Sequence, residues 1–117
     1  MPVINANGAF FNDQGIKMSN TAAITALSLT ITIQATPGVT FSGQYNTVGG
    51  QIAQSHSSTA TTITYQFTLA AGQTLNPGSY LFDAQMGGNG TVHPASGDSF
   101  IATYTTGGNT FTQMNHF

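Results

Sequence analysis

The stretch ITALSLTITIQAT, residues 24–36, decides the fold of this chain. Its aliphatic and polar side chains alternate over eight positions: Leu27, Ser28, Leu29, Thr30, Ile31, Thr32, Ile33 and Gln34. A period of two places the aliphatic set on one face and the polar set on the other. The segment therefore predicts a half-buried β-strand, and Pro37-Gly38 ends it.

The same period continues along the chain between clusters of Gly, Pro and Asn. Further strands are predicted over residues 39–45, 61–69, 80–86 and 100–104, with a shorter first strand at 15–20. Gly107-Gly108-Asn109 is expected to join its neighbouring strand to residues 110–117 as a hairpin. About seven or eight short strands without a helical pattern indicate an all-β antiparallel sandwich, jelly-roll or immunoglobulin-like. We expect a single domain over residues 1–117.

The strand at 39–45 leaves the position of one aromatic ring open. Val39, Phe41 and Tyr45 share parity, so an unbroken strand places Tyr45 in the core. A β-bulge at Gly43 would reverse the parity and turn Tyr45 outward. Tyr65, Tyr80 and Tyr104 are in register with clear core residues, and we expect them to be buried.

The composition excludes several classes of function. Only 3% of the residues are charged, against about a quarter in an ordinary soluble domain. The single Lys or Arg is Lys17, which cannot neutralise the phosphates of a nucleic acid or the surface of an anionic membrane. Thr, Ser, Asn and Gln replace the charges. This composition fits an extracellular β-protein with a neutral, polar partner such as carbohydrate.

The chain offers few residues for catalysis or for metal binding. Its three acids are Asp13, Asp83 and Asp98. Glycoside hydrolysis needs two placed carboxylates, and this chain has no Glu or Arg to assist them. We therefore expect no enzyme activity. There is no Cys, and the three His lack metal-ligand spacing, so no cofactor is expected. The sequence allows one alternative, a calcium site formed by Asp98, Asn89 and backbone carbonyls of the loop 87–98.

Four stretches resemble the cellulose-binding modules of bacterial cellulases and xylanases, above all the family-2-type modules. They are FNDQGIKMSNT at 11–21, NTAAITALSLTITI at 20–33, FSGQYNTVGGQIAQS at 41–55 and LNPGSYLFDAQMGG at 75–88. Tyr45 matches one exposed aromatic position of that family, and Gln14 stands at another. The row of Trp that those modules lay on crystalline cellulose is missing. The resemblance therefore implies binding of single glucan chains, in a groove or a shallow cleft.

A sugar ring offers a CH face and equatorial hydroxyls, so its binder needs an aromatic platform and groups that both donate and accept hydrogen bonds. Asn and Gln do both. The expected carbohydrate-binding residues lie around the bend at Gly49-Gly50: Tyr45, Gln44, Asn46, Gln51, Gln54 and His56. The alternative for the amides is that they are solvated strand residues.

The expected function is thus a non-catalytic module that binds plant cell-wall β-glucans: cellulose chains, cello-oligosaccharides, xyloglucan or mixed-linkage glucan. It would tether a glycoside hydrolase to its polymer in a secreted, extracellular enzyme. The alternative is a structural or adhesive extracellular β-domain without glycan affinity. Neither reading involves nucleic acid or a membrane. With so few charges to protect its sheet edges, a homodimer is one further expectation.

Overall fold

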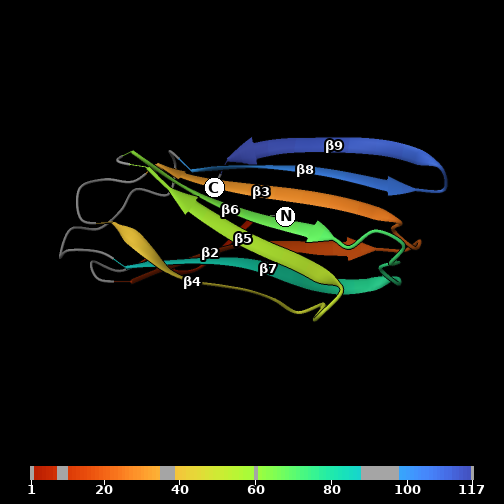
Figure 1. Cartoon of the computed structure of the whole chain (residues 1–117), viewed down its shortest axis with the longest axis horizontal. Coiled ribbons are helices and arrows are strands. Elements are labelled where there is room, and N and C mark those ends of the chain that lie inside the picture. Colours follow the sequence, from red (N-terminus) through yellow and green to blue (C-terminus); the bar gives the residue numbers. More distant parts are fainter. Residues whose placement is uncertain (1, 8–10, 35–38, 60, 88–97, 117) are drawn as a thin grey trace.

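The computed structural model describes residues 2–7, 11–34, 39–59, 61–87 and 98–116 as an antiparallel β-sandwich (Figure 1). One sheet has the order β1-β2-β7-β4 and the other β5-β6-β3-β8-β9. The strands are β1 (Pro2–Asn7), β2 (Phe11–Asn20), β3 (Ala26–Gln34), β4 (Thr40–Asn46), β5 (Ile52–Ser58), β6 (Thr62–Leu69), β7 (Gly78–Gly87), β8 (Ser99–Thr106) and β9 (Asn109–His116). The predicted all-β sandwich is confirmed.

Strand β3 lies at the centre of the five-stranded sheet, between β6 and β8. Its alternation is as the sequence predicts, because Leu27, Leu29, Ile31 and Ile33 are buried while Ala26, Ser28 and Gln34 are exposed. Ile31 is paired with Tyr65 on β6 and with Phe100 on β8, so three strands place apolar side chains on the same inner face.

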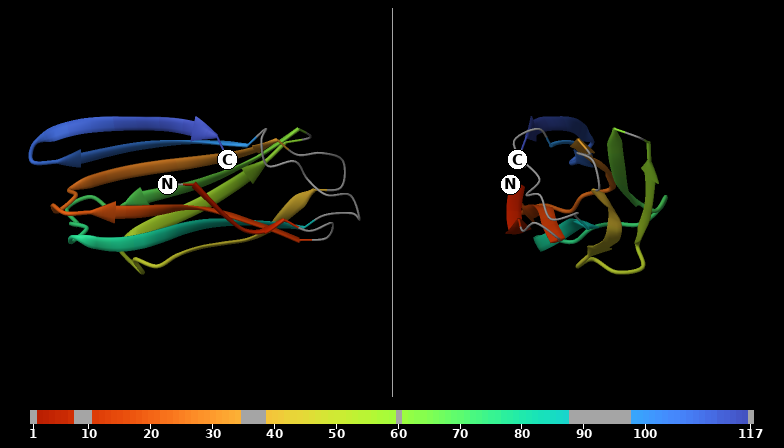
Figure 2. Two further views of the ribbon diagram at one scale, coloured as in Figure 1. Left: turned by 180° about the vertical axis from the view of Figure 1, so that it is seen from behind. Right: turned by 90° about the vertical axis from the view of Figure 1, so that its left-hand side faces the viewer.

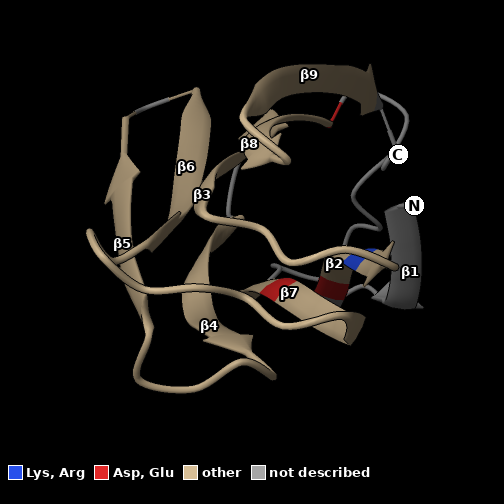
Figure 3. Cartoon of the chain, turned by 90° about the vertical axis from the view of Figure 1, so that its right-hand side faces the viewer, with Lys and Arg blue, Asp and Glu red and all other residues tan. Residues whose placement is uncertain are grey.

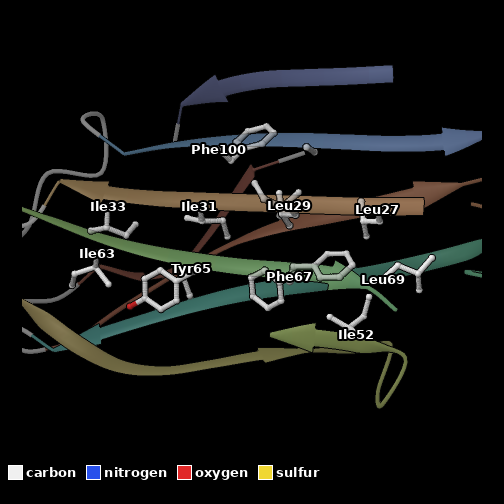
Figure 4. Packing of buried hydrophobic residues seen from close by; sticks show 14 of the residues in the cluster. Leu27, Leu29, Ile31, Ile33, Ile52, Ile63, Tyr65, Phe67, Leu69 and Phe100 are labelled. Carbon is white, nitrogen blue, oxygen red and sulfur yellow. The ribbon is translucent and has the colours of Figure 1, made fainter. Parts of the chain in front are cut away.

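The core fills the space between the two sheets (Figure 4). Phe67 of β6 and Phe82 of β7 meet edge to face, with their ring centroids 5.4 Å apart. Tyr65 is also fully buried, and its hydroxyl donates a hydrogen bond of 2.6 Å to the carbonyl of Gln85. A single phenol therefore joins β6 of one sheet to β7 of the other. Tyr80 and Tyr104 are only partly buried against this core, which corrects the expectation that they are buried.

Strand β4 contains the bulge that the sequence left open. Its register with β7 shifts between Phe41 and Gly43, so that Phe41 pairs with Met86 but Tyr45 pairs with Asp83. Met86 belongs to the core, and Phe41 packs against it, whereas Tyr45 lies on the outer face and is 37% exposed. Tyr45 is thus on the surface.

The structure adds elements that the pattern did not predict. Strand β1 at Pro2–Asn7 and strand β5 at Ile52–Ser58 bring the number in the described residues to nine. Strand β2 begins at Phe11, ahead of the predicted start at Gly15. The hairpin of β8 and β9 is confirmed, and its turn uses Gly107 and Gly108 at φ 58° and 79°, a region that glycine tolerates.

The two sides of the sandwich differ (Figure 2). On one side, β4 and β5 lie next to each other and close the space between the sheets. On the other side, β2 faces β8 and β9 across a groove, described below.

Candidate functional site

Three of the predicted binding residues form a hydrogen-bonded seam on the closed side of the sandwich. The Gln44 amide donates to the carbonyls of Ser55 and Gln66, both at 3.0 Å. Gln54 returns a bond of 3.1 Å to the carbonyl of Gln44. The amide of Asn46 donates to Oε1 of Gln54 at 2.9 Å. We call Gln44, Asn46 and Gln54 the amide seam, because together they join β4 to the five-stranded sheet.

The two other polar residues of the predicted site also make internal contacts. Gln51 donates to Oε1 of Gln73 at 3.1 Å. The ring of His56 stacks on Phe41, with 3.5 Å between the centroids and 5° between the planes. His56 therefore covers an aromatic side chain at the rim of the core. The structure brings these residues to one edge of the sandwich, where the amides hydrogen-bond other parts of the chain and the His56 ring stacks on Phe41.

Tyr45 lies apart from them, on the outer face of the four-stranded sheet. Its neighbours across β7 and β2 are Asp83 and, one row along, Asp13. Burial, with smaller contributions from the charges of Asp83 and Asp13, raises the pKa of the Tyr45 phenol. The hydroxyl therefore stays protonated at neutral pH and remains a donor.

The same outer face holds most of the charge of the molecule. Asp13 and Lys17 belong to β2 and Asp83 to β7, as the red and blue segments in Figure 3 show. Asp83 is fully buried despite its place on the outer face. Asp98, the remaining acid, accepts a 2.8 Å hydrogen bond from the backbone N–H of Gln34. All three acids thus make contacts within the protein.

A groove lies on the open side of the sandwich. It has a volume of about 530 Å³, within the range of small-molecule sites. Its floor is apolar, and its rim is mostly polar. The floor is formed by Ile16, Met18, Ile24, Phe100 and Ala102, and the rim by Lys17, Ser19, Asn20, Thr21, Ala22, Tyr104, Thr106 and Gln113. We call this hollow the open-side groove.

Two aromatic rings flank the open-side groove. Tyr104 lines it, and Phe111 lies beside Tyr104 with 5.6 Å between the ring centroids. Phe111 is 46% exposed, although it is on the inner face of the five-stranded sheet. The hairpin thus presents an accessible ring pair to the open side.

Amide groups supply unused hydrogen-bonding capacity at the same place. Asn20 donates to the carbonyls of Ala22 and Asn76, which fixes its side chain, but its Oδ1 is buried and accepts no hydrogen bond from the described residues. The Gln113 amide is exposed and makes no hydrogen bond within the described part of the chain. The exposed amide of Gln113 can therefore both donate and accept beside the ring pair, whereas the unpaired acceptor of Asn20 lies beneath the surface.

Sequence reasoning missed this groove because each of its residues looks ordinary alone. The parity of Tyr104 predicts a core residue, and Asn20 and Gln113 look like solvated strand residues. The hairpin turn held the only usable signal, because Gly107-Gly108 sets Tyr104 opposite Phe111. The accessibility of that pair depends on the separation of the two sheets, which no local pattern encodes.

No group of three or more His, Asp or Glu within the described ranges is placed to hold a metal ion. The calcium site expected from Asp98 and Asn89 falls mostly on residues 88–97, outside the described residues. The described segments include no helix long and apolar enough to cross a membrane. No protein-family model, curated protein or solved structure matches the chain.

Proposed function

We propose that this chain is a non-catalytic module that binds neutral β-glucan chains, and that it does so in the open-side groove. The supporting observation is the combination found there: the Tyr104–Phe111 ring pair stands beside the exposed amide of Gln113. Aromatic rings suit the CH faces of sugars, and amides suit their hydroxyls.

The charge distribution supports a neutral ligand. Lys17 is the one charged residue at the open-side groove among the described residues, and the alternation of β2 turns its side chain to the outer face. A polyanion would need counter-charges that the groove does not offer, whereas a neutral sugar needs none. The carboxylates that hydrolysis would require lie elsewhere, and Asp83 has no exposed surface. The proposed role is therefore binding, in an extracellular enzyme whose hydrolase domain the module holds near its polymer.

Native affinity electrophoresis tests the proposal. The protein is run through gels containing xyloglucan, mixed-linkage β-glucan, carboxymethylcellulose, xylan or no polysaccharide. We expect retardation in at least one glucan gel. Unchanged mobility in every gel, together with no pull-down on insoluble cellulose or chitin, would reject glycan binding and favour the structural or adhesive alternative.

Variants of β9 locate the site. Gln113 and Thr112 are neighbours whose side chains point to opposite faces of the strand. We expect Gln113→Ala and Phe111→Ala to weaken retardation about three- to tenfold, because each removes a sugar contact worth about a kcal/mol. The matched control, Thr112→Ala, leaves retardation unchanged.

Tyr45→Ala separates the two places where a platform ring is available. Tyr45 lies on the outer face of the other sheet, so binding in the open-side groove does not depend on it. Loss of retardation in Tyr45→Ala with normal behaviour of Gln113→Ala and Phe111→Ala would move the site to the outer face.

A further inference from the structure

Each sheet edge exposes backbone N–H and C=O groups that a further strand can pair with, and proteins usually obstruct such edges. The edge strands here are β1 and β4 of one sheet and β5 and β9 of the other. Three of the four are obstructed. Strand β1 begins with Pro2, which cannot donate, and shifts register between Ile4 and Ala6.

The edges of β4 and β5 obstruct each other. Strand β4 is bulged between Phe41 and Gly43, and a bulge disturbs the row of groups available to a new strand. The amide seam then joins this edge to β5, because the Gln44 amide donates a hydrogen bond to the carbonyl of Ser55. A strand added to either edge would have to displace these contacts.

Strand β9 carries none of these obstructions. It pairs with β8 in unbroken register from Ser99 opposite His116 to Thr106 opposite Asn109. Its sequence NTFTQMNH contains no Pro, Lys, Asp or Glu. The side chains from Asn109 to Asn115 are exposed on both faces, and no described strand pairs with its outer edge.

Exposed apolar side chains gather on the same hairpin. Among the described residues, the exposed large hydrophobic side chains are Tyr45, Ile101, Phe111 and Met114. Three of these four belong to β8 and β9, and Met114 is 71% exposed directly opposite Ile101. A strand placed beside β9 would cover part of this surface as well as the backbone of its outer edge.

We propose that β9 pairs with β9 of a second copy of this chain, antiparallel about a two-fold axis, so that the two five-stranded sheets become one continuous sheet. Residues opposite each other in an antiparallel pair have their side chains on the same face of the sheet. The two-fold axis must therefore pass through a residue and not between two residues, and the residues at the middle of β9 are Thr112 and Gln113. Thr, Gln, Asn and Met then face one another, and no like charges meet.

The charge distribution favours a second copy over a charged partner. Asp13, Lys17 and Asp83 all lie on the other sheet, and the net charge of the chain is only -2. Long-range repulsion between two copies that approach through β9 is therefore small. A basic or acidic partner strand would find no counter-charge on β9 itself.

Single cysteines test the pairing, because the native chain has no Cys. Residues opposite each other across an antiparallel pair have Cα atoms about 4.5–5.5 Å apart, which a disulfide spans. We expect mild oxidation to convert either Thr112→Cys or Gln113→Cys to a covalent dimer, depending on the residue at the axis. Ser57→Cys, exposed on the obstructed edge of β5, is the control and stays monomeric.

Light scattering during size exclusion gives the independent measurement. The wild-type chain is expected at twice the mass of one chain and to dissociate on dilution. Thr112→Lys places two like charges near the axis and should raise the dissociation constant at least tenfold, whereas Thr68→Lys, exposed on β6, should not. A monomeric wild type, or a dimer that Thr112→Lys leaves intact, would overturn the proposal, as would cross-linking through Ser57→Cys alone.

Discussion

At the scale of single residues, two glycines on the outer face of the four-stranded sheet lie opposite side chains of β7. A Cβ on Gly15 would stand 2.7 Å from Oδ1 of Asp83 and 2.9 Å from the carbonyl of Phe82. A Cβ on Gly43 would stand 2.6 Å from Oε1 of Gln85, and its nearest neighbours are all atoms of that side chain. The first position is bounded by backbone and a buried carboxylate, and the second by the end of a flexible side chain.

Gly15→Ala is therefore expected to lower the free energy of unfolding by about 1–3 kcal/mol, because the backbone of β7 must move to admit the methyl group. Gly43→Ala, the matched control, should change it by less than about 1 kcal/mol. Urea denaturation at neutral pH measures both. Equal effects of the two substitutions would contradict the close approach of β2 and β7 at Gly15.

Tyr65 predicts how stability falls at alkaline pH. Burial, helped by the charges of Asp83 and Asp98, raises the pKa of its phenol far above the ordinary value of about 10. Below that pH the phenol is protonated in both states. Above it only the unfolded chain releases the proton, so the free energy of unfolding falls by about 1.4 kcal/mol per pH unit.

The variant Tyr65→Phe isolates this contribution. It should be less stable at neutral pH by about 1–2 kcal/mol, because the carbonyl of Gln85 loses its donor. Between about pH 10 and 12 its stability should then decline less steeply than that of the wild type. Parallel declines of the two proteins in urea titrations would show that Tyr65 does not control the alkaline limit.

Individual residues also show where sequence reasoning stops. The resemblance puts Gln14 at an exposed aromatic position, but Gln14 is fully buried and both polar atoms of its amide are without a hydrogen bond from the described residues. Its parity with Ile16 indicates the inner face, and the structure follows that parity. For Tyr45 the parity is misleading, because one inserted residue in β4 reverses it.

At the scale of elements, strands with one apolar face were predictable and strands held by polar contacts were not. Alternation identifies β3, β6 and β7, whose inner side chains form the core. Strand β5 has only Ile52 buried, so its pairing with β6 and the amide seam fix it in place without a hydrophobic signal. The same seam shows what the predicted amide residues do within the fold: they hydrogen-bond β4 to the five-stranded sheet.

The amide seam makes a prediction that separates its structural role from sugar binding. Gln44→Ala removes two hydrogen bonds to backbone carbonyls and should lower the free energy of unfolding by about 1–3 kcal/mol, with glucan retardation unchanged. The control Gln66→Ala trims an amide on the outer face of β6 and should have little effect on either. Loss of retardation in Gln44→Ala at full stability would return the binding site to β4.

At the scale of the whole molecule, the near absence of charge sets how binding responds to salt. Stacking and neutral hydrogen bonds are not screened by ions, unlike contacts between charged groups. The dissociation constant for a retained glucan should change by less than about twofold between about 0.05 and 0.5 M NaCl. A steep loss of affinity with salt, measured by calorimetry, would indicate that Lys17 or the acids carry the interaction.

The sandwich as a whole was predictable, whereas its asymmetry was not. Alternating strands and glycine turns specify two packed layers. Which side of the sandwich closes depends on long-range pairings, such as that between Gln44 and the carbonyl of Gln66. The open-side groove lies on the side that these pairings do not close. The candidate site therefore depends on contacts between residues that are far apart in the sequence.

The single cation also makes the chain a reporter of its own opening. Trypsin cuts after Lys or Arg, so it has one target here, the bond that follows Lys17. That bond lies inside β2, which is paired with β1 on one side and with β7 on the other. A protease can bind and cleave such a segment only after the segment has detached from the sheet. The rate of cleavage after Lys17 therefore reports the opening of β2. A ligand bound in the open-side groove, next to β2, should slow this cleavage in proportion to the occupancy of the groove.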